Sequence, residues 1–171
     1  MRLDALTWEE SWESTKWRHG HLETLRTPSM LTEKMQKEWY DTVVCSRTSP
    51  HRYWALKETG KEIKEKSSLT WSEEYLVGVG GLTYISWENR SAEISLIIAD
   101  KFHRMKLGEK AVDLLLTQAF NMMNLEVVYG EVYKCNPTGV KFWDKMILKY
   151  DAVRVVKPFV KWYAGQYWDS V

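Results

Sequence analysis

The stretch SAEISLIIADKFHRMKLGEKAVDLLL, residues 91–116, decides the fold of this 171-residue chain. Residues 94–99 form a short apolar run rich in branched side chains, which is typical of a buried strand and too short to cross a membrane. Further along, Leu107, Ala111 and Leu115 recur every four residues among polar side chains. This spacing predicts an amphipathic helix with one buried side.

A basic loop joins this strand to this helix. It contains His103, Arg104 and Lys106, and Lys110 follows in the first helical turn. The first turn of a helix presents N–H groups without intrahelical partners and the positive end of the helix dipole. The loop is therefore expected to bind an anion such as a pyrophosphate, with a basic surface turn as the alternative.

The composition is that of an ordinary globular protein and points to one domain, residues 1–171. The chain is 44% hydrophobic and 27% charged, and its 24 Lys and Arg nearly balance its 23 Asp and Glu. The near-zero net charge argues against a nucleic-acid partner. The acidic N-terminal sequence has no apolar segment typical of a signal peptide, so we expect a cytoplasmic protein that does not bind membranes.

The two cysteines and the neighbouring histidines do not have the spacing of metal ligands. Cys45 and Cys135 lack partners for a disulfide framework, and we expect buried thiols in a reducing compartment. His19 and His21 have no third ligand in sight, so no metal site is expected.

The remaining sequence alternates strand and helix patterns. Thr32 is expected to cap a helix, and Asn136-Pro137 to open another. Residues 59–72, rich in alternating Lys and Glu, are expected to form a solvated hairpin tip. The glycines at 78, 80 and 81 predict a bulge or a close approach of a ligand. The other predicted elements are a helix at 8–19 and strands at 1–7, 51–58, 73–87, 125–133, 150–156 and 158–167.

The order of these elements resembles the GCN5-related N-acetyltransferase (GNAT) superfamily over nearly the whole chain. Residues 92–102, AEISLIIADKF, are similar to the central strand of that family. The family's cofactor loop usually has Gln or Arg, two residues, Gly, one residue, and Gly or Ala. Residues 103–108 stand at these positions, with Gly108 retained and Lys106 in place of the first glycine.

A second matching segment follows the fifth predicted strand. The segment NPTGVKFWDKM, residues 136–146, resembles the family's N-x-x-A-x-x-x-Y-x-K, with Gly139 for Ala and Trp143 for Tyr. Earlier in the chain, Trp17-Arg18 and Leu25-Arg26, with Trp39 after them, are similar to members that acetylate nucleotide-linked aminosugars or protein N-terminal amines.

The resemblance implies an α/β (α+β) fold with a mixed, mostly antiparallel sheet of six to seven strands. The sheet would be splayed at its centre and covered by helices on both faces. It also implies acetyl-CoA as the cofactor, with the central strand pairing with pantetheine through its main chain and the loop binding the pyrophosphate. The residues implied in cofactor binding are Leu96, Ile97, Ile98, His103, Arg104, Met105, Lys106, Leu107, Gly108, Glu109, Asn136 and Trp143.

For catalysis, the resemblance places Glu93 where relatives have a general base. A surface ion pair with Arg90 is the alternative. Glu131 is the second choice of base, with a paired strand carboxylate as its alternative. Trp143 replaces the family's acidic tyrosine and has no proton to give, which leaves water or Tyr133 as the acid. Trp143 would otherwise be helix core, and Asn136 a helix cap.

The acceptor is expected to be a primary amine. Cations suit a phosphate or carboxylate, and aromatic faces suit a sugar or base. The residues chosen on this ground are Trp17, Arg18, Arg26, Tyr84 and Trp87. A small-molecule aminosugar is the first expectation and a protein N-terminus or lysine the second. A protein that binds CoA or a partner without catalysis is the alternative from another class, and the aromatic tail suggests a homodimer.

Overall fold

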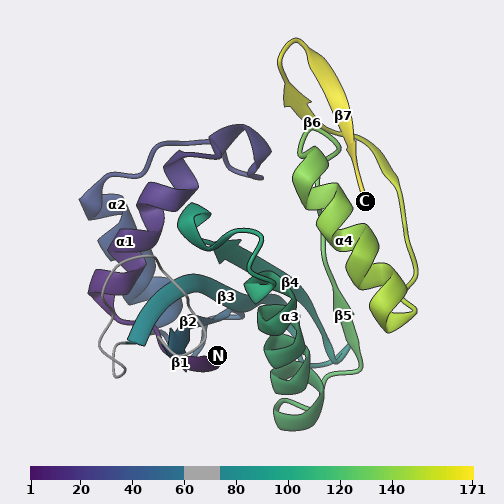
Figure 1. Ribbon diagram of the computed structural model, residues 1–171. Coiled ribbons are helices and arrows are strands. Elements are labelled where there is room, and N and C mark those ends of the chain that lie inside the picture. The colour runs from purple at the N-terminus through teal and green to yellow at the C-terminus, as the bar shows by residue number, and fades with distance from the viewer. Residues whose placement is uncertain (60–73) are drawn as a thin grey trace. The chain divides into compact units, whose positions relative to one another are not determined.

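The computed structural model describes residues 1–59 and 74–171 (Figure 1), so nearly all of the predicted hairpin tip lies outside the described residues. These residues form two compact units. Unit 1 comprises residues 1–18 and 31–129, and unit 2 comprises residues 19–30 and 130–171.

Unit 1 is built on a five-stranded sheet in the order β1-β2-β3-β4-β5. Its first four strands pair antiparallel, and β5 pairs parallel to β4. The mixed, mostly antiparallel sheet expected from the sequence is therefore confirmed. The strands are β1 (Arg2–Ala5), β2 (Arg52–Thr59), β3 (Glu74–Ser86), β4 (Ser91–Ile98) and β5 (Val127–Tyr129).

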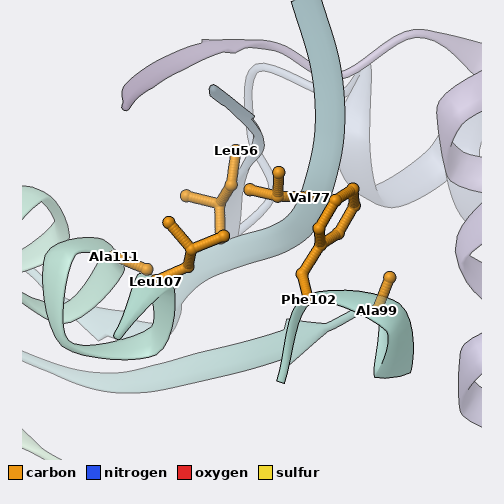
Figure 2. Close-up of a cluster of buried hydrophobic side chains, with 6 residues drawn as sticks. All are labelled: Leu56, Val77, Ala99, Phe102, Leu107 and Ala111. Carbon is orange, nitrogen blue, oxygen red and sulfur yellow. The ribbon is translucent and has the colours of Figure 1, made fainter. Parts of the chain in front are cut away.

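Helix α3 (Leu107–Thr117), continued by a π-helical turn (Gln118–Met122), packs against β3 and β4. Figure 2 shows the apolar cluster beneath its first turns, in which Leu107 and Ala111 of the helix meet Leu56, Val77, Ala99 and Phe102. The buried side predicted for this helix is confirmed, because Leu107, Ala111 and Leu115 are all buried.

The helices α1 (Trp8–His19) and α2 (Glu33–Trp39) supply the second apolar cluster of the sheet. Trp39 packs with Val79 and Ile97 there. The predicted cap of α2 is present, since the Thr32 side chain accepts a hydrogen bond from the Met35 N–H at 3.3 Å. A buried hydrogen bond of 2.8 Å from Gln36 Nε2 to Ser11 Oγ joins the two helices.

The glycine-rich part of β3 brings neighbouring strands unusually close. A Cβ built on Gly78 would lie 2.4 Å from the carbonyl oxygen of Ile97, so no side chain fits at this position. Opposite it, the β2–β3 register shifts between Leu56 and Lys57. The irregular register predicted from these glycines is therefore present.

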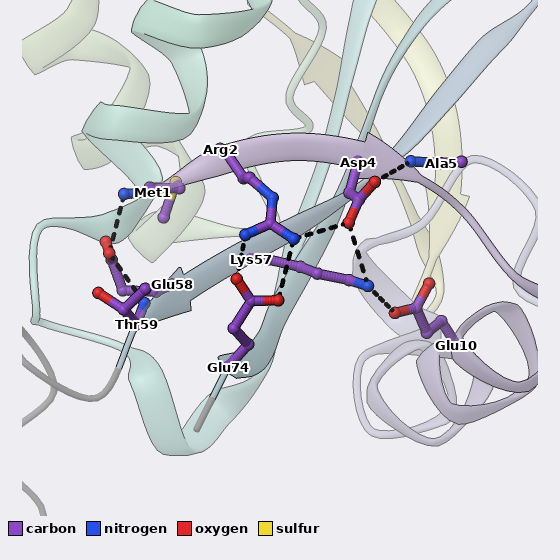
Figure 3. A network of polar contacts seen from close by, with 9 residues as sticks. All are labelled: Met1, Arg2, Asp4, Ala5, Glu10, Lys57, Glu58, Thr59 and Glu74. Atoms are coloured by element: carbon purple, nitrogen blue, oxygen red, sulfur yellow. Dashed lines mark hydrogen bonds and ion pairs between the residues drawn. The ribbon is translucent and has the colours of Figure 1, made fainter. Parts of the chain in front are cut away.

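Charged side chains tie the edge strand β1 to its neighbours (Figure 3). Arg2 bonds Glu74 and Asp4, and Lys57 lies 2.9 Å from Glu10. Next to this network, the buried carboxylate of Glu58 contacts the amino group of Met1 at 2.8 Å. A charged, short edge strand also resists pairing with other chains.

Unit 2 contains a short 3-10 turn (Leu22–Thr24), α4 (Pro137–Tyr150) and a hairpin of β6 (Lys157–Tyr163) and β7 (Gln166–Ser170). The predicted start of α4 is confirmed, because Asn136 Oδ1 accepts the Gly139 N–H at 2.8 Å.

The strands of the C-terminal half differ from the prediction. The seven described strands form sheets of five and two rather than one sheet. Residues 150–156 are not a strand, and Pro158 lies inside β6, where the register shift between Lys157 and Lys161 tolerates a residue without an N–H. The hairpin turns at Ala164-Gly165, whose φ angles of 52° and 79° suit a tight two-residue loop.

Two smaller expectations were also wrong. Strand β5 ends at Tyr129, four residues before the predicted end, so Glu131 and Tyr133 do not lie on it. Cys45 is exposed at the end of the π-helical turn Tyr40–Val44, and Cys135 is only partly buried.

Candidate functional site

Strands β4 and β5 pair only over their first three residues. Glu93 and Tyr129 form the last pair, although β4 continues to Ile98. Within the described residues, no strand pairs with β4 on this side beyond Glu93. Residues 94–98 thus leave an open edge in the middle of the sheet, at which an extended ligand can add as a strand.

The hydrogen bonds of the next residue show which main-chain groups face this open edge. The Ala99 N–H donates to the Val77 carbonyl at 3.0 Å, so the odd-numbered residues, Ile97 included, direct their main-chain groups toward β3. Leu96 and Ile98 therefore direct theirs toward the open edge. The Ile98 carbonyl already contacts His103 Nε2 at 2.9 Å, which leaves the Leu96 groups and the Ile98 N–H.

The loop after β4 combines left-handed backbone with anchored apolar side chains. Arg104 and Lys106 have φ angles of 63° and 59°, and both are exposed. Between and after them, Met105 packs against the core and Leu107 is buried. Alternation of this kind turns N–H groups toward one point and forms an anion-binding concavity, here at the N-terminus of α3.

Lys106 stands where the resembling family has its first glycine, and it adopts the conformation for which glycine is suited. It is the N-cap of α3, with φ 59° and ψ 13°, and its side chain makes no capping hydrogen bond. A left-handed conformation costs a residue with a Cβ about 1 kcal/mol. Lys106 thus adopts a backbone conformation that glycine would adopt without strain, and it adds a cation to the loop.

Glu93 lies at the point where β4 and β5 separate. It pairs with Thr83 of β3, whose Oγ1 donates to the Glu93 carbonyl at 3.2 Å. Arg90, the expected ion-pair partner, instead donates to the Asn124 carbonyl at 2.8 Å and bonds Glu126.

In unit 2, Glu131 is held by cations. Its carboxylate lies 2.7 Å from Arg26 and 3.5 Å from Lys157, and it accepts the Ser170 hydroxyl at 2.9 Å. Burial alone would raise the pKa of Glu131, but the hydrogen bonds from Arg26 and Ser170 outweigh burial and lower it. A carboxylate stabilised in this way is a weak general base.

The other predicted residues of unit 2 have mainly structural contacts. The Tyr133 hydroxyl lies 3.5 Å from Glu131, and the Lys161 ammonium lies 5.0 Å from the centre of its ring. Asn136 uses its side chain as the cap of α4. Trp143 meets the Phe142 ring edge-on at 5.3 Å and is partly buried.

The residues expected to bind the acceptor differ in their contacts and exposure. Trp17 packs against the apolar clusters on both sides of the core, and Arg26 is the partner of Glu131. Burial lowers the pKa of Arg18, although Tyr53 acts in the opposite sense. Tyr84 and Trp87 are each 52% exposed.

The sequence analysis missed His51. Its ring lies 5.0 Å from the Tyr84 ring, and its Nδ1 lies 3.2 Å from the Tyr84 backbone nitrogen. Nothing in the local sequence marks this contact, because it depends on the pairing of β2 with β3.

No group of three or more His, Cys, Asp or Glu suited to a metal is found in residues 1–59 and 74–171. Over the same ranges, every helix is too short or too polar to span a membrane.

Comparison with known proteins identifies relatives of this fold. Residues 2–146 match the family model described as an acetyltransferase (GNAT) domain. No curated protein sequence matches the chain significantly.

Among solved structures, the chain is similar to spermidine N-acetyltransferase SpeG from Vibrio cholerae in complex with CoA and spermine. The TM-score is 0.75 at 17% identity, covering 98% of this chain and 90% of that one. A chimera of the Vibrio cholerae enzyme and hSSAT gives 0.72 at 19% identity, covering 99% and 92%. Identities this low establish a shared fold and leave the acceptor open.

Proposed function

The chain belongs to the GNAT acetyltransferase family, and from this premise we propose that it acetylates a primary amine of a small polyamine-like cation. It is an acetyl-CoA-dependent N-acetyltransferase, and the proposal concerns its acceptor and the residues that act. The observation that carries the proposal is the open edge of β4, which begins immediately after Glu93.

The open edge and the following loop fit coenzyme A. The main-chain groups of Leu96 and Ile98 would pair with the amides of pantetheine, and the N–H groups from Arg104 to Glu109 would hold the pyrophosphate. The side chains of Arg104 and Lys106 add positive charge there. Bound acetyl-CoA supplies an acetyl group activated as a thioester.

Glu93 is the proposed general base. An ammonium acceptor must lose a proton before it can attack, and a carboxylate can take that proton directly or through a water. Glu131 is less suited because its lowered pKa reflects stable pairing with Arg26. No strong acid is required for the leaving group, since a thiolate is already stable at neutral pH relative to an alkoxide. Tyr133 is the remaining choice of acid.

Charge and aromatic contacts favour a polyamine over an aminosugar. The solved structure with CoA and spermine is of an enzyme named for spermidine, and nothing in the comparisons points to an aminosugar. The half-exposed rings of Tyr84 and Trp87 can contact a cation through their faces.

A protein amine is the second acceptor that we consider, and it is tested alongside polyamines below. We also propose that residues 1–171 act as a single domain, since the family match runs through both units. A homodimer through the β6–β7 hairpin is a further expectation, because Phe159, Trp162 and Tyr167 are 60–70% exposed there.

Two measurements test the proposal in sequence. Calorimetric titration with acetyl-CoA, and with desulfo-CoA as an unreactive analogue, should show binding. Release of free thiol is then followed with spermidine, spermine, glucosamine and peptides bearing a free N-terminus or lysine. Turnover with spermidine and spermine but not glucosamine is expected. Turnover with the peptides alone would show that the acceptor is a protein amine and not a polyamine. Binding of acetyl-CoA without turnover of any amine would contradict the proposal that the protein is catalytic.

A further inference from the structure

We propose that His51 is a positioning residue for the acceptor: its imidazole accepts the Tyr84 backbone N–H and so holds the Tyr84 side chain beside Glu93. The role rests on the proposed function, because it assigns Tyr84 to the amine-binding side of that site. The contact itself can be tested without any activity.

Tyr84 occupies a strained bulge in β3. The pairs Thr83–Glu93 and Ser86–Ser91 enclose two residues on β3 and one on β4, so β3 carries an extra residue. Tyr84 has a φ of 50°, a left-handed conformation that is unfavourable for an aromatic residue. Bulges of this kind re-aim side chains and are over-represented beside active sites.

The segment before β2 holds this bulge in place. The Tyr84 N–H donates to His51 Nδ1 at 3.2 Å, and the Ile85 N–H donates to the Pro50 carbonyl at 2.8 Å. The Tyr84 ring stands edge-on to the His51 ring at 5.0 Å. Both the backbone and the side chain of Tyr84 are thus in contact with His51.

The strand register places His51 and Glu93 on the same face of the sheet. His51 stacks on Tyr53, two residues along β2, and Tyr53 pairs with Gly81 of β3. Thr83 lies two residues after Gly81 and pairs with Glu93. Since side chains alternate along strands, His51, Thr83 and Glu93 share a face, with Tyr84 at its bulged border.

The hydrogen bond fixes the tautomer of His51. A backbone N–H can only donate, so Nδ1 must accept and the neutral ring carries its proton on Nε2. A second proton would bind Nδ1 and oppose the Tyr84 N–H. The contact therefore exists only with a neutral ring.

The groups around His51 favour that neutral form. Arg52 is adjacent in sequence, Tyr53 and Tyr84 contact the ring, and Glu93 is the carboxylate on the same face. Burial, and secondarily the charge of Arg52, lower the pKa of His51 below its ordinary value of 6.5. The ring is neutral at pH 7, and the Tyr84 contact is lost only as the pH falls through the lowered pKa.

The test combines two substitutions with one spectroscopic measurement. His51→Asn keeps an acceptor for the Tyr84 N–H but does not titrate, whereas His51→Leu removes the acceptor. Spermidine KM and kcat, and CoA affinity by calorimetry, are measured from pH 5 to pH 9. The tautomer is read from long-range proton–nitrogen NMR spectra of the intact protein, which has only four histidines.

We expect His51→Leu to raise the spermidine KM by up to about tenfold at pH 7, the upper end of what the loss of one hydrogen bond costs. Wild type should show the same increase only at acid pH, and His51→Asn should show neither effect. CoA affinity should stay within about twofold throughout. A neutral His51 protonated on Nδ1, or a His51→Leu protein with the wild-type KM, would overturn the role of His51.

Failure of this proposal can be told apart from failure of the acceptor assignment. If no amine is acetylated, the acceptor assignment fails, but the NMR measurement still reports the tautomer. If His51→Leu weakens CoA binding as much as acceptor binding, His51 supports the fold generally and the positioning role is wrong.

Discussion

Glu93 and Tyr129 form the last pair of the parallel ladder between β4 and β5, and the open edge of β4 begins at the next residue. The proposed base and the proposed site for the pantetheine amides are thereby joined through consecutive residues of one strand. On β4, the main-chain groups of odd-numbered residues bond to β3, whereas those of Leu96 and Ile98 point to the open edge where the ligand is proposed to bind.

This alternation can be tested by replacing single amides with esters, which deletes an N–H and keeps the side chain. At Ile97 the ester should cost about 1 kcal/mol of unfolding free energy, because the N–H faces β3, and should leave CoA affinity unchanged. At Leu96 it should leave stability unchanged and weaken CoA binding about fivefold. Chemical denaturation and calorimetry distinguish the two, and equal effects at both positions would contradict the open edge.

Lys106→Gly separates strain from charge in the cofactor loop. Glycine should raise the unfolding free energy by roughly 0.5–1 kcal/mol, because the left-handed conformation no longer strains a Cβ. CoA affinity should nevertheless fall about threefold to tenfold, with a shallower dependence on salt, because a cation is lost.

Asp151→Gly is the matched control for Lys106→Gly. Asp151 also has a left-handed conformation, with φ 51°, but lies at the end of α4. It should show the gain in stability without any change in CoA binding. If Lys106→Gly bound CoA as tightly as wild type, the positive charge of Lys106 would not contribute to CoA binding.

Glu93→Gln should lower kcat/KM for the amine by roughly 10²–10⁴-fold and remove the limb of the pH profile that reports its ionisation. CoA affinity should not change. Glu126→Gln is the control, because it makes the same chemical change in an exposed carboxylate that bonds Arg90. A pH profile unchanged by Glu93→Gln would exclude Glu93 as the base.

Glu131→Gln should reduce stability in a pH-dependent way. The pKa of Glu131 is lowered in the folded state, so its contribution is present above its ordinary value of 4.5 and is lost as the pH falls through the lowered pKa. The variant should lose roughly 1–2 kcal/mol at pH 7, and this loss should shrink as the pH falls below 4.5, measured by denaturation. A large decrease in kcat without a change in stability would instead indicate that Glu131 takes part in catalysis.

The local part of this structure could be predicted from the sequence. Helix starts at Thr32 and Asn136, the buried side of α3 and the irregularity at Gly78 follow from spacing and backbone preference. The end of β5 could not be predicted, because the apolar sequence continues beyond Tyr129 while its partner strand is no longer adjacent.

Long-range contacts were likewise outside the reach of sequence patterns. The partner of Arg26 is 105 residues away, and the contact of His51 with Tyr84 depends on strand register rather than on any motif. The family resemblance carried by residues 92–102 and 136–146 is confirmed, because the family model matches residues 2–146.

The composition of unit 2 has a consequence for the order of folding. Residues 19–30 belong to it, yet the Arg26 side chain pairs with Glu131 and the Leu25 carbonyl accepts a hydrogen bond from Lys161, both made much later. At typical synthesis rates of 5–20 residues per second, Arg26 is made roughly 5 to 20 seconds before Glu131. Strands β2 to β5 are all synthesised during that interval, while this early segment still lacks the residues that fix it.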